Sequence, residues 1–136
     1  MFITREVDYA IRVFRAIAGG GYRTVGEICR KEILPQQFVY KIMKKIEQAG
    51  LVKTMRGAHG GCVLVGDLRK TSLYDLINVL EGDPAISSCM RENHECEWKK
   101  QNAMPCTVHR QLMGIQETLN EELRMCTLHK LIFGVD

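Results

Sequence analysis

Three cysteines lie in the most polar segment of the chain, between Ser87 and His109. Cys89, Cys96 and Cys106 stand there among charged and amide side chains, and the segment offers little apolar surface for a core. Because free cysteines are usually buried like small hydrophobic residues, this placement indicates another role. Thiolates bind soft metals and iron–sulfur clusters, and a polar loop allows them to converge on one. The segment is therefore predicted to bind a cluster or a metal.

The other features of the composition favour reduced thiols. The 136 residues are 46% hydrophobic, which is enough for a packed core, and they form one domain or a small domain with an added helical part. Arg5, Glu6 and Asp8 interrupt the start of the chain, and no apolar run is long enough for a membrane span. We therefore expect a cytoplasmic protein without membrane contact, in which cysteines are ligands, redox sensors or core residues. Three cysteines on apolar faces are expected to be core residues: Cys29, Cys62 and Cys126.

Charge divides the chain into two unlike halves. Residues 1–70 contain 13 Lys and Arg against 6 Asp and Glu, whereas residues 71–136 contain 6 against 10. A basic half joined to an acidic half suggests that the first half meets a polyanion. Chance variation of surface charge is the alternative.

The first half shows helical patterns that alternate with caps. Apolar residues recur at helical spacing from Thr4 to Ala18, and three glycines follow. Thr24 and Glu27 have the spacing of a capping box, which predicts a short second helix that ends near Glu32.

A third helix and a hairpin should follow. Pro35 is expected at the first helical position, and the helix should end at Gly50. Two strand-like runs, Leu51–Met55 and Cys62–Val65, flank the glycine-rich turn RGAHGG. The buried face of the third helix is predicted to consist of Phe38, Ile42, Ile46 and Ala49. This order of elements predicts a mainly α fold with a small β-hairpin, a winged helix-turn-helix.

In a helix-turn-helix protein the second helix of the motif enters the major groove of DNA. The outward face of the helix from Pro35 to Gln48 is rich in amides and lysines, the side chains that contact bases and phosphates. The candidate contacts on this helix are Gln36, Gln37, Tyr40, Lys41 and Lys44, with Lys45 and Gln48 on the same face. Arg56 and His59, at the tip of the hairpin, are suited to the narrow minor groove. A solvated helix face and an ordinary glycine turn are the alternatives.

The second half predicts a dimer. Thr71 or Ser72 should cap a helix that packs through Leu73, Leu76, Ile77 and Leu80. A later long helix carries a stripe that consists of Val108, Leu112, Ile115, Leu119, Leu123 and Cys126. A twofold dimer would cover this stripe and place two recognition helices on adjacent major grooves, whereas packing onto its own domain is the alternative. We predict a DNA-binding domain over residues 1–70 and a dimerisation part over 71–136, with a sensor loop at 84–109.

These motifs together resemble the Rrf family of bacterial winged helix-turn-helix regulators. The resemblance rests on DYAIRVF, AGLV, RGAHGG, SLYDLINVLEG and the three-cysteine loop before a long helix. It implies a homodimeric transcription factor, with many members that hold an iron–sulfur cluster on three loop cysteines and one further ligand. Carried over to this sequence, the three are Cys89, Cys96 and Cys106. Their pattern, C-x6-C-x9-C, has longer gaps than is usual in the family.

The resemblance offers two choices for the fourth ligand. In the IscR-like branch a C-x2-H pattern supplies a histidine to a 2Fe–2S cluster, and His109 occupies that place here. In the NsrR-like branch an acidic residue of the other subunit is the ligand, and Asp8 corresponds to it. We favour His109 and a 2Fe–2S cluster, because imidazole is the better iron donor. Asp8 and His94 are the alternative ligands, and 4Fe–4S is the alternative cluster.

The sequence thus predicts a transcriptional regulator, a repressor or an activator, and not an enzyme. It should bind a palindromic operator in double-stranded DNA as a homodimer, with an affinity that an iron–sulfur cluster controls in response to redox state, iron, cluster status or nitric oxide. The alternative is the same dimer with a structural zinc or a thiol-based switch in the loop.

Overall fold

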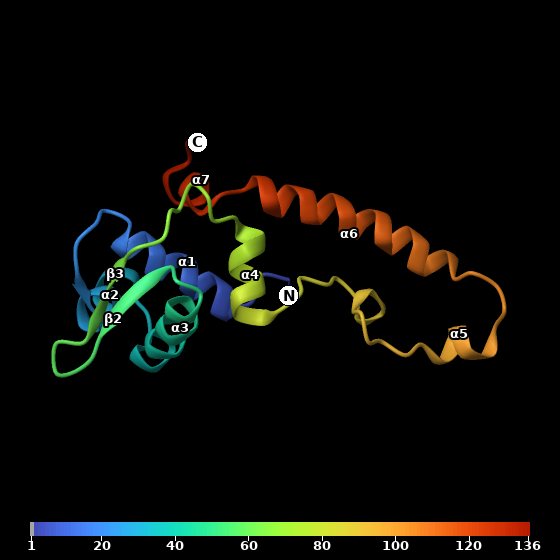
Figure 1. Cartoon of the computed structure of the whole chain (residues 1–136), viewed down its shortest axis with the longest axis horizontal. Coiled ribbons are helices and arrows are strands. Elements are labelled where there is room, and N and C mark those ends of the chain that lie inside the picture. Colours follow the sequence, from blue (N-terminus) through green and yellow to red (C-terminus); the bar gives the residue numbers. More distant parts are fainter. Residues whose placement is uncertain (1) are drawn as a thin grey trace.

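The chain is divided between a compact body and an extension. The structure, a computed structural model, describes residues 2–136. Figure 1 shows helix α6 reaching away from the body toward the cysteine loop and α5. The body contains α1 (Arg5–Ile17), β1 (Arg23–Thr24), α2 (Val25–Glu32), α3 (Gln36–Gln48), β2 (Val52–Met55), β3 (Gly61–Leu64), α4 (Leu73–Glu81) and α7 (Leu128–Phe133). The extension contains the 3-10 turn η1 (Ser88–Met90), α5 (Glu97–Gln101) and α6 (Thr107–Met125).

Local capping sets where the helices of the body begin. The Thr24 hydroxyl accepts from the Glu27 amide at 3.2 Å and the Glu27 carboxylate accepts from the Thr24 amide at 2.8 Å, which confirms the capping box. Ser72 and Asp75 form a second such box at the start of α4. Pro35 is the N-cap of α3 and not its first helical residue, so that prediction was wrong by one position.

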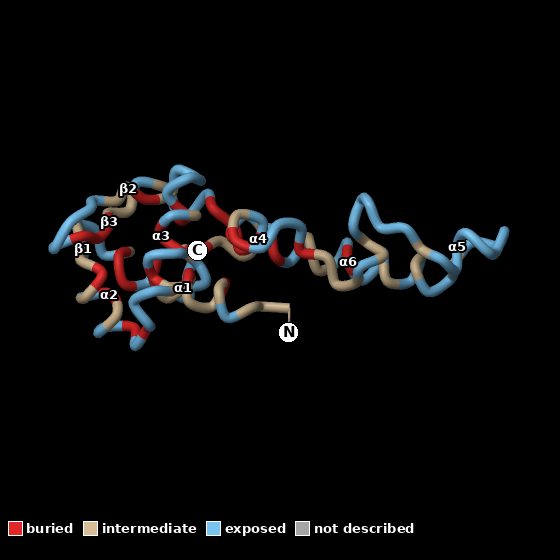
Figure 2. The backbone as a smooth tube through the Cα atoms, turned by 90° about the horizontal axis from the view of Figure 1, so that it is seen from below, coloured by how far each residue is buried: buried red, intermediate tan, exposed pale blue. Residues whose placement is uncertain are grey.

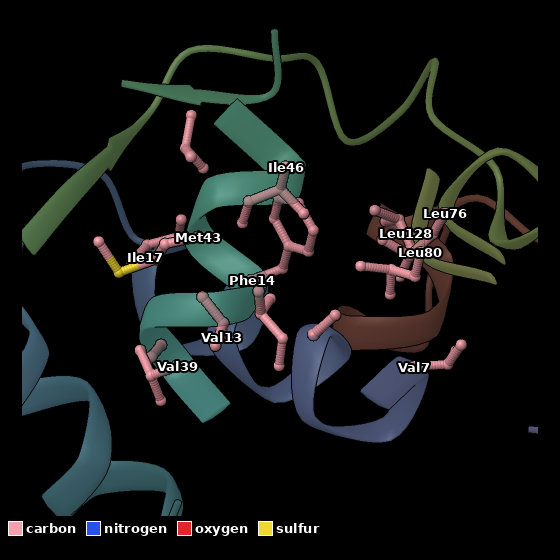
Figure 3. Close-up of a cluster of buried hydrophobic side chains, with 14 of the residues drawn as sticks. Val7, Val13, Phe14, Ile17, Val39, Met43, Ile46, Leu76, Leu80 and Leu128 are labelled. Atoms are coloured by element: carbon pink, nitrogen blue, oxygen red, sulfur yellow. The ribbon is translucent and has the colours of Figure 1, made fainter. Parts of the chain in front are cut away.

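One hydrophobic core joins the two ends of the chain. Figure 3 shows side chains of α1, α3, α4 and α7 gathered in it, with Phe14, Ile46, Leu76 and Leu128 among them. The buried residues of α3 are Val39, Ile42, Met43 and Ile46. The prediction was therefore wrong for two positions. Phe38 is half-buried with its ring edge-on to Tyr9, and Ala49 is exposed because it lies at the C-cap.

The predicted hairpin belongs to a three-stranded antiparallel sheet with the order β1-β3-β2. Thr54 pairs with Cys62 and Met55 with Gly61, as the hairpin requires. The third strand, β1, pairs Thr24 with Gly61 on the other side of β3. The sequence did not predict it, because two residues cannot display the alternation that marks a strand.

Helix α6 leaves most of its surface exposed (Figure 2). Its C-terminal half packs on the body through Leu119, Leu123 and the following Cys126. Its N-terminal half does not, since Val108 is 65% and Ile115 57% exposed. The predicted stripe is thus covered by the protein's own domain over one half only. No helix in residues 2–136 is long and apolar enough to cross a membrane.

Candidate DNA-binding surface and cysteine loop

Helix α3 presents amide and basic side chains on the side opposite the core. Gln36, Gln37, Tyr40 and Lys44 are exposed there, as the sequence predicted. Two further lysines on this helix are held by α1. Lys45 Nζ lies 2.6 Å from Glu6 Oε1, and Lys41 Nζ lies 3.4 Å from Glu6 Oε2. Lys45 is consequently half-buried and not part of the open face, contrary to the prediction.

A groove of about 360 Å³ separates α3 from the wing, the segment between β2 and β3. It is lined by Tyr40, Met43, Lys44, Glu47, Thr54, Met55, Arg56, Gly57 and Gly60. The structure therefore brings Tyr40 and Lys44 to the same surface as Arg56, although these residues come from separate elements. Such a surface, with a positive side chain on each wall, is suited to a nucleic acid backbone.

Glu47 fixes the wing to the recognition helix. Its carboxylate accepts from the Thr54 hydroxyl at 2.6 Å and from the Thr54 amide at 2.8 Å. These two bonds lower the pKa of Glu47, the hydroxyl bond most. This role of Glu47 could not be predicted from the sequence, since the bond to β2 is a tertiary contact.

We expect this attachment to loosen in acid. A carboxyl group with a pKa lowered by folding contributes stability above its unfolded pKa, about 4.3, and that stability is lost as the pH falls through the lowered folded value. Titration from neutral pH to about 3 should shift the Thr54 amide resonance in NMR spectra, with an apparent pKa below 4.3. Glu47→Gln should abolish this titration, and a Thr54 resonance that titrates unchanged in that variant would contradict the assignment.

The wing tip is held from a second side. The Tyr22 hydroxyl donates a hydrogen bond to the carbonyl of His59, and the Val25 amide donates to the carbonyl of Gly60 at 2.9 Å. Gly57 has φ 112°, a conformation that side chains rarely adopt. Arg56 and His59 are both exposed at this tip. These hydrogen bonds therefore hold the wing in place, and its two candidate DNA contacts are exposed to solvent.

The three thiols of the cysteine loop lie in or directly before three helical elements. Cys89 lies in η1, Cys96 precedes α5, and Cys106 is the N-cap of α6. All three are half-buried. Cys106 Sγ accepts from the His109 amide at 3.4 Å, so the first turn of α6 brings these two residues together. Within residues 2–136, no three His, Cys, Asp or Glu side chains converge as metal ligands would.

The chemistry of the donor set nevertheless fits a cluster. His109 Nδ1 is buried and has no hydrogen-bond partner among the described residues, so that nitrogen is free of competing bonds. Asp8, in contrast, is already paired with Arg12 at 3.0 Å, and His94 lies exposed in the loop. Three thiols and one imidazole are donors that iron–sulfur clusters accept.

The remaining cysteines are part of the packing. Burial raises the pKa of Cys62 to about 11 and also raises that of Cys29, which keeps both thiols protonated at neutral pH. Cys126 packs against the core at the end of α6. These positions agree with the prediction that they are core residues.

Helices α2 and α3 form a helix-turn-helix pair that packs with α1, and a hairpin wing with basic side chains follows. This arrangement defines a winged helix-turn-helix protein. The sequence model of one family, Rrf2, described as "Iron-dependent Transcriptional regulator", matches residues 3–133. The chain belongs to this Rrf2 family. It is thus a DNA-binding transcriptional regulator and not an enzyme, which confirms the predicted family, fold class and absence of enzymatic function.

Other proteins resemble this chain in sequence or in fold. Protein aau3 of Rhizobium meliloti is 32% identical over 91 residues, which are 65% of this chain and 59% of that protein. A putative HTH-type transcriptional regulator of Aquifex aeolicus is 25% identical over 97% of this chain and 92% of its own length. The structure of CymR from Bacillus subtilis has a TM-score of 0.76 at 24% identity and covers 98% of both chains. That structure is similar to this one in fold.

Proposed function

We propose that this regulator binds its operator as a homodimer and that an iron–sulfur cluster on the cysteine loop controls its affinity for DNA. The observation that carries the proposal is the position of the loop. Its half-exposed thiols lie directly before α6, the helix with the unpaired apolar surface, and Cys106 and His109 form the first turn of that helix.

In this proposal, α3 and the wing make the contacts to DNA. Gln36, Gln37 and Tyr40 would meet base edges in the major groove while Lys44 contacts phosphates. Arg56 and His59 would enter the minor groove beside it. Lys41 would contribute less than Lys44, because its ammonium group is already paired with Glu6.

The second copy of the chain is proposed to cover α6. Val108, Met113 and Ile115 are exposed large apolar side chains on that helix. A twofold dimer through this surface would place two copies of α3 about one DNA turn apart, so the operator should be palindromic.

The cluster ligands would be Cys89, Cys96, Cys106 and His109, with 2Fe–2S favoured over 4Fe–4S. A bound cluster would supply sensitivity to redox state, iron supply, cluster status or nitric oxide. The chain's own part is to gather the thiolates and to keep His109 Nδ1 free of other bonds. Asp8 is the less suitable fourth ligand, because it would first have to leave Arg12.

Absorption spectroscopy with iron and sulfide assays, on protein purified without oxygen, tests the cluster. We expect a brown wild type, and Cys96→Ala should lose most of its visible absorption because a thiolate ligand is missing. Cys29→Ala is the matched control outside the loop and should keep the colour. Fluorescence anisotropy then measures how tightly each form binds operator DNA. We expect the binding free energies of the cluster-loaded and cluster-free forms to differ by about 1–3 kcal/mol.

A thiol-based switch is the second candidate. Two observations favour it: the likeness of the fold to CymR, which is described as a global cysteine regulator, and the fact that no three possible metal ligands converge within residues 2–136. A colourless wild type that binds DNA and responds to peroxide would support this candidate. Stoichiometric zinc would instead indicate a structural site.

A further inference from the structure

The carboxylate of Glu6 occupies an unusual place for an acidic residue, against the helix that reads DNA. It is the second residue of α1, and its side chain is only 14% exposed. Lys41 and Lys45 stand one helical turn apart on α3, so both ammonium groups reach the same carboxylate, at 3.4 Å and 2.6 Å. One partly buried carboxylate therefore pairs with two lysines of the recognition helix.

Lys45 is held from the other side as well. Its Nζ donates to the carbonyl oxygen of Leu80, in the last turn of α4, at 2.8 Å. The side chain of Lys45 is 31% exposed as a result. Lys44, by comparison, is exposed and has no ion-pair partner among residues 2–136. Neighbouring lysines on one helix thus differ in their freedom to reach a phosphate.

We propose that Glu6 is a built-in counter-charge that withholds Lys41 and Lys45 from the DNA backbone and thereby limits binding that is independent of sequence. The proposal rests on the proposed mode of DNA binding through α3. Phosphate contacts add affinity for every sequence alike, whereas contacts to base edges discriminate. A recognition helix on which two lysines share one carboxylate therefore depends more on Gln36, Gln37 and Tyr40. Glu6 is in this sense a residue that determines specificity without touching a base.

Glu6→Gln tests the proposal, because it removes the charge of the side chain with little change in its shape. Binding of a fluorescent duplex of random sequence is measured by anisotropy over a range of salt concentrations. With two lysines released, Glu6→Gln should bind about tenfold more tightly at low salt, and its salt dependence should steepen by about one to two phosphates per protomer. Glu6→Gln combined with Lys45→Gln should lose much of this gain.

Asp136→Asn is the matched control. It removes one carboxylate that also pairs with a lysine, Lys130 at 3.2 Å, but on the terminal segment that Figure 1 places away from α3. A salt dependence of Glu6→Gln equal to that of Asp136→Asn would overturn the proposal. Thermal unfolding of all variants checks that they are folded.

A measurement without DNA separates failure of this proposal from failure of the proposed function. Amine acylation followed by mass spectrometry should show slower modification of Lys45 than of Lys44 in the wild type, and the difference should shrink in Glu6→Gln. Equal rates in the wild type would overturn the counter-charge itself. Protected lysines in a wild type that binds no duplex at low salt would instead overturn the mode of DNA binding, and with it this proposal.

Discussion

Replacing Gly61 by alanine is expected to detach β1 from the sheet and to cost about 2–4 kcal/mol in the free energy of unfolding. A Cβ atom at this position would lie 2.0 Å from the carbonyl oxygen of Arg23 and 2.6 Å from the Cα of Thr24. Both are backbone atoms of β1, so no rotation of a side chain can relieve the overlap. The strand must move, and with it the first turn of α2.

The displacement of β1 should also affect the position of the wing. Gly61 pairs with Thr24 on one side and with Met55 on the other, and the Val25 amide bonds to Gly60 directly beside it. A displaced β1 therefore removes one of the supports that position Arg56 and His59. We expect urea unfolding to show the lower stability and anisotropy to show weaker DNA binding at the same salt concentration.

Gly19→Ala is the control for this substitution. Apart from its chain neighbours, no residue places an atom within 4 Å of the Cβ that alanine would add at Gly19. A change there should stay within about 0.5 kcal/mol, as surface substitutions usually do. If Gly61→Ala unfolds at the same urea concentration as Gly19→Ala, β1 does not pack in solution as it does in this structure.

The features that sequence analysis predicted correctly are those that depend on local chemistry. The capping box of Thr24 and Glu27 involves residues three apart, and the apolar face of α4 repeats within one helix. Such patterns act over one or two turns and can be read from the chain alone.

The features it missed depend on contacts between distant segments. Glu6 and Lys41 are 35 residues apart in the chain, and their pairing follows from the packing of α1 on α3. The bond from Tyr22 to His59 joins residues 37 apart, and β1 exists as a strand only because β3 lies beside it. No periodicity or motif marks these residues. The same limit applies to the cysteine loop, where residue types predict ligands while the folded loop decides which of them meet.

Gln116 is the second position at which a large effect is expected, because it joins the cysteine loop to α6. It is buried, with 9% exposure, on a helix that is otherwise largely exposed. Its Oε1 accepts from the Ile86 amide at 2.7 Å. Its Nε2 donates to the Pro84 carbonyl at 2.8 Å and to Asn120 Oδ1 at 2.9 Å. One amide thus fixes the base of the loop at two backbone groups.

Gln116→Leu keeps the approximate volume of the side chain and removes all three hydrogen bonds. The Ile86 amide and the Pro84 carbonyl lose their partner in a partly buried place, which should cost about 2–3 kcal/mol locally. We expect hydrogen exchange at the Ile86 amide to quicken by about thirtyfold or more, since exchange follows the free energy of local opening. If this contact couples the loop to the dimer, the variant should also reduce the difference in DNA affinity between the cluster-loaded and cluster-free forms.

Gln111→Leu on the same helix is the matched control, because Gln111 is exposed. Its exchange rates in residues 84–86 should equal those of the wild type. Gln116→Glu offers a second test, since a carboxylate can accept from the Ile86 amide but cannot donate to the Pro84 carbonyl or to Asn120. It should give an intermediate rate near neutral pH. Equal protection of the Ile86 amide in the wild type and the three variants would mean that local turns hold the base of the loop. Coupling between the loop and α6 would then run through Cys106 and His109.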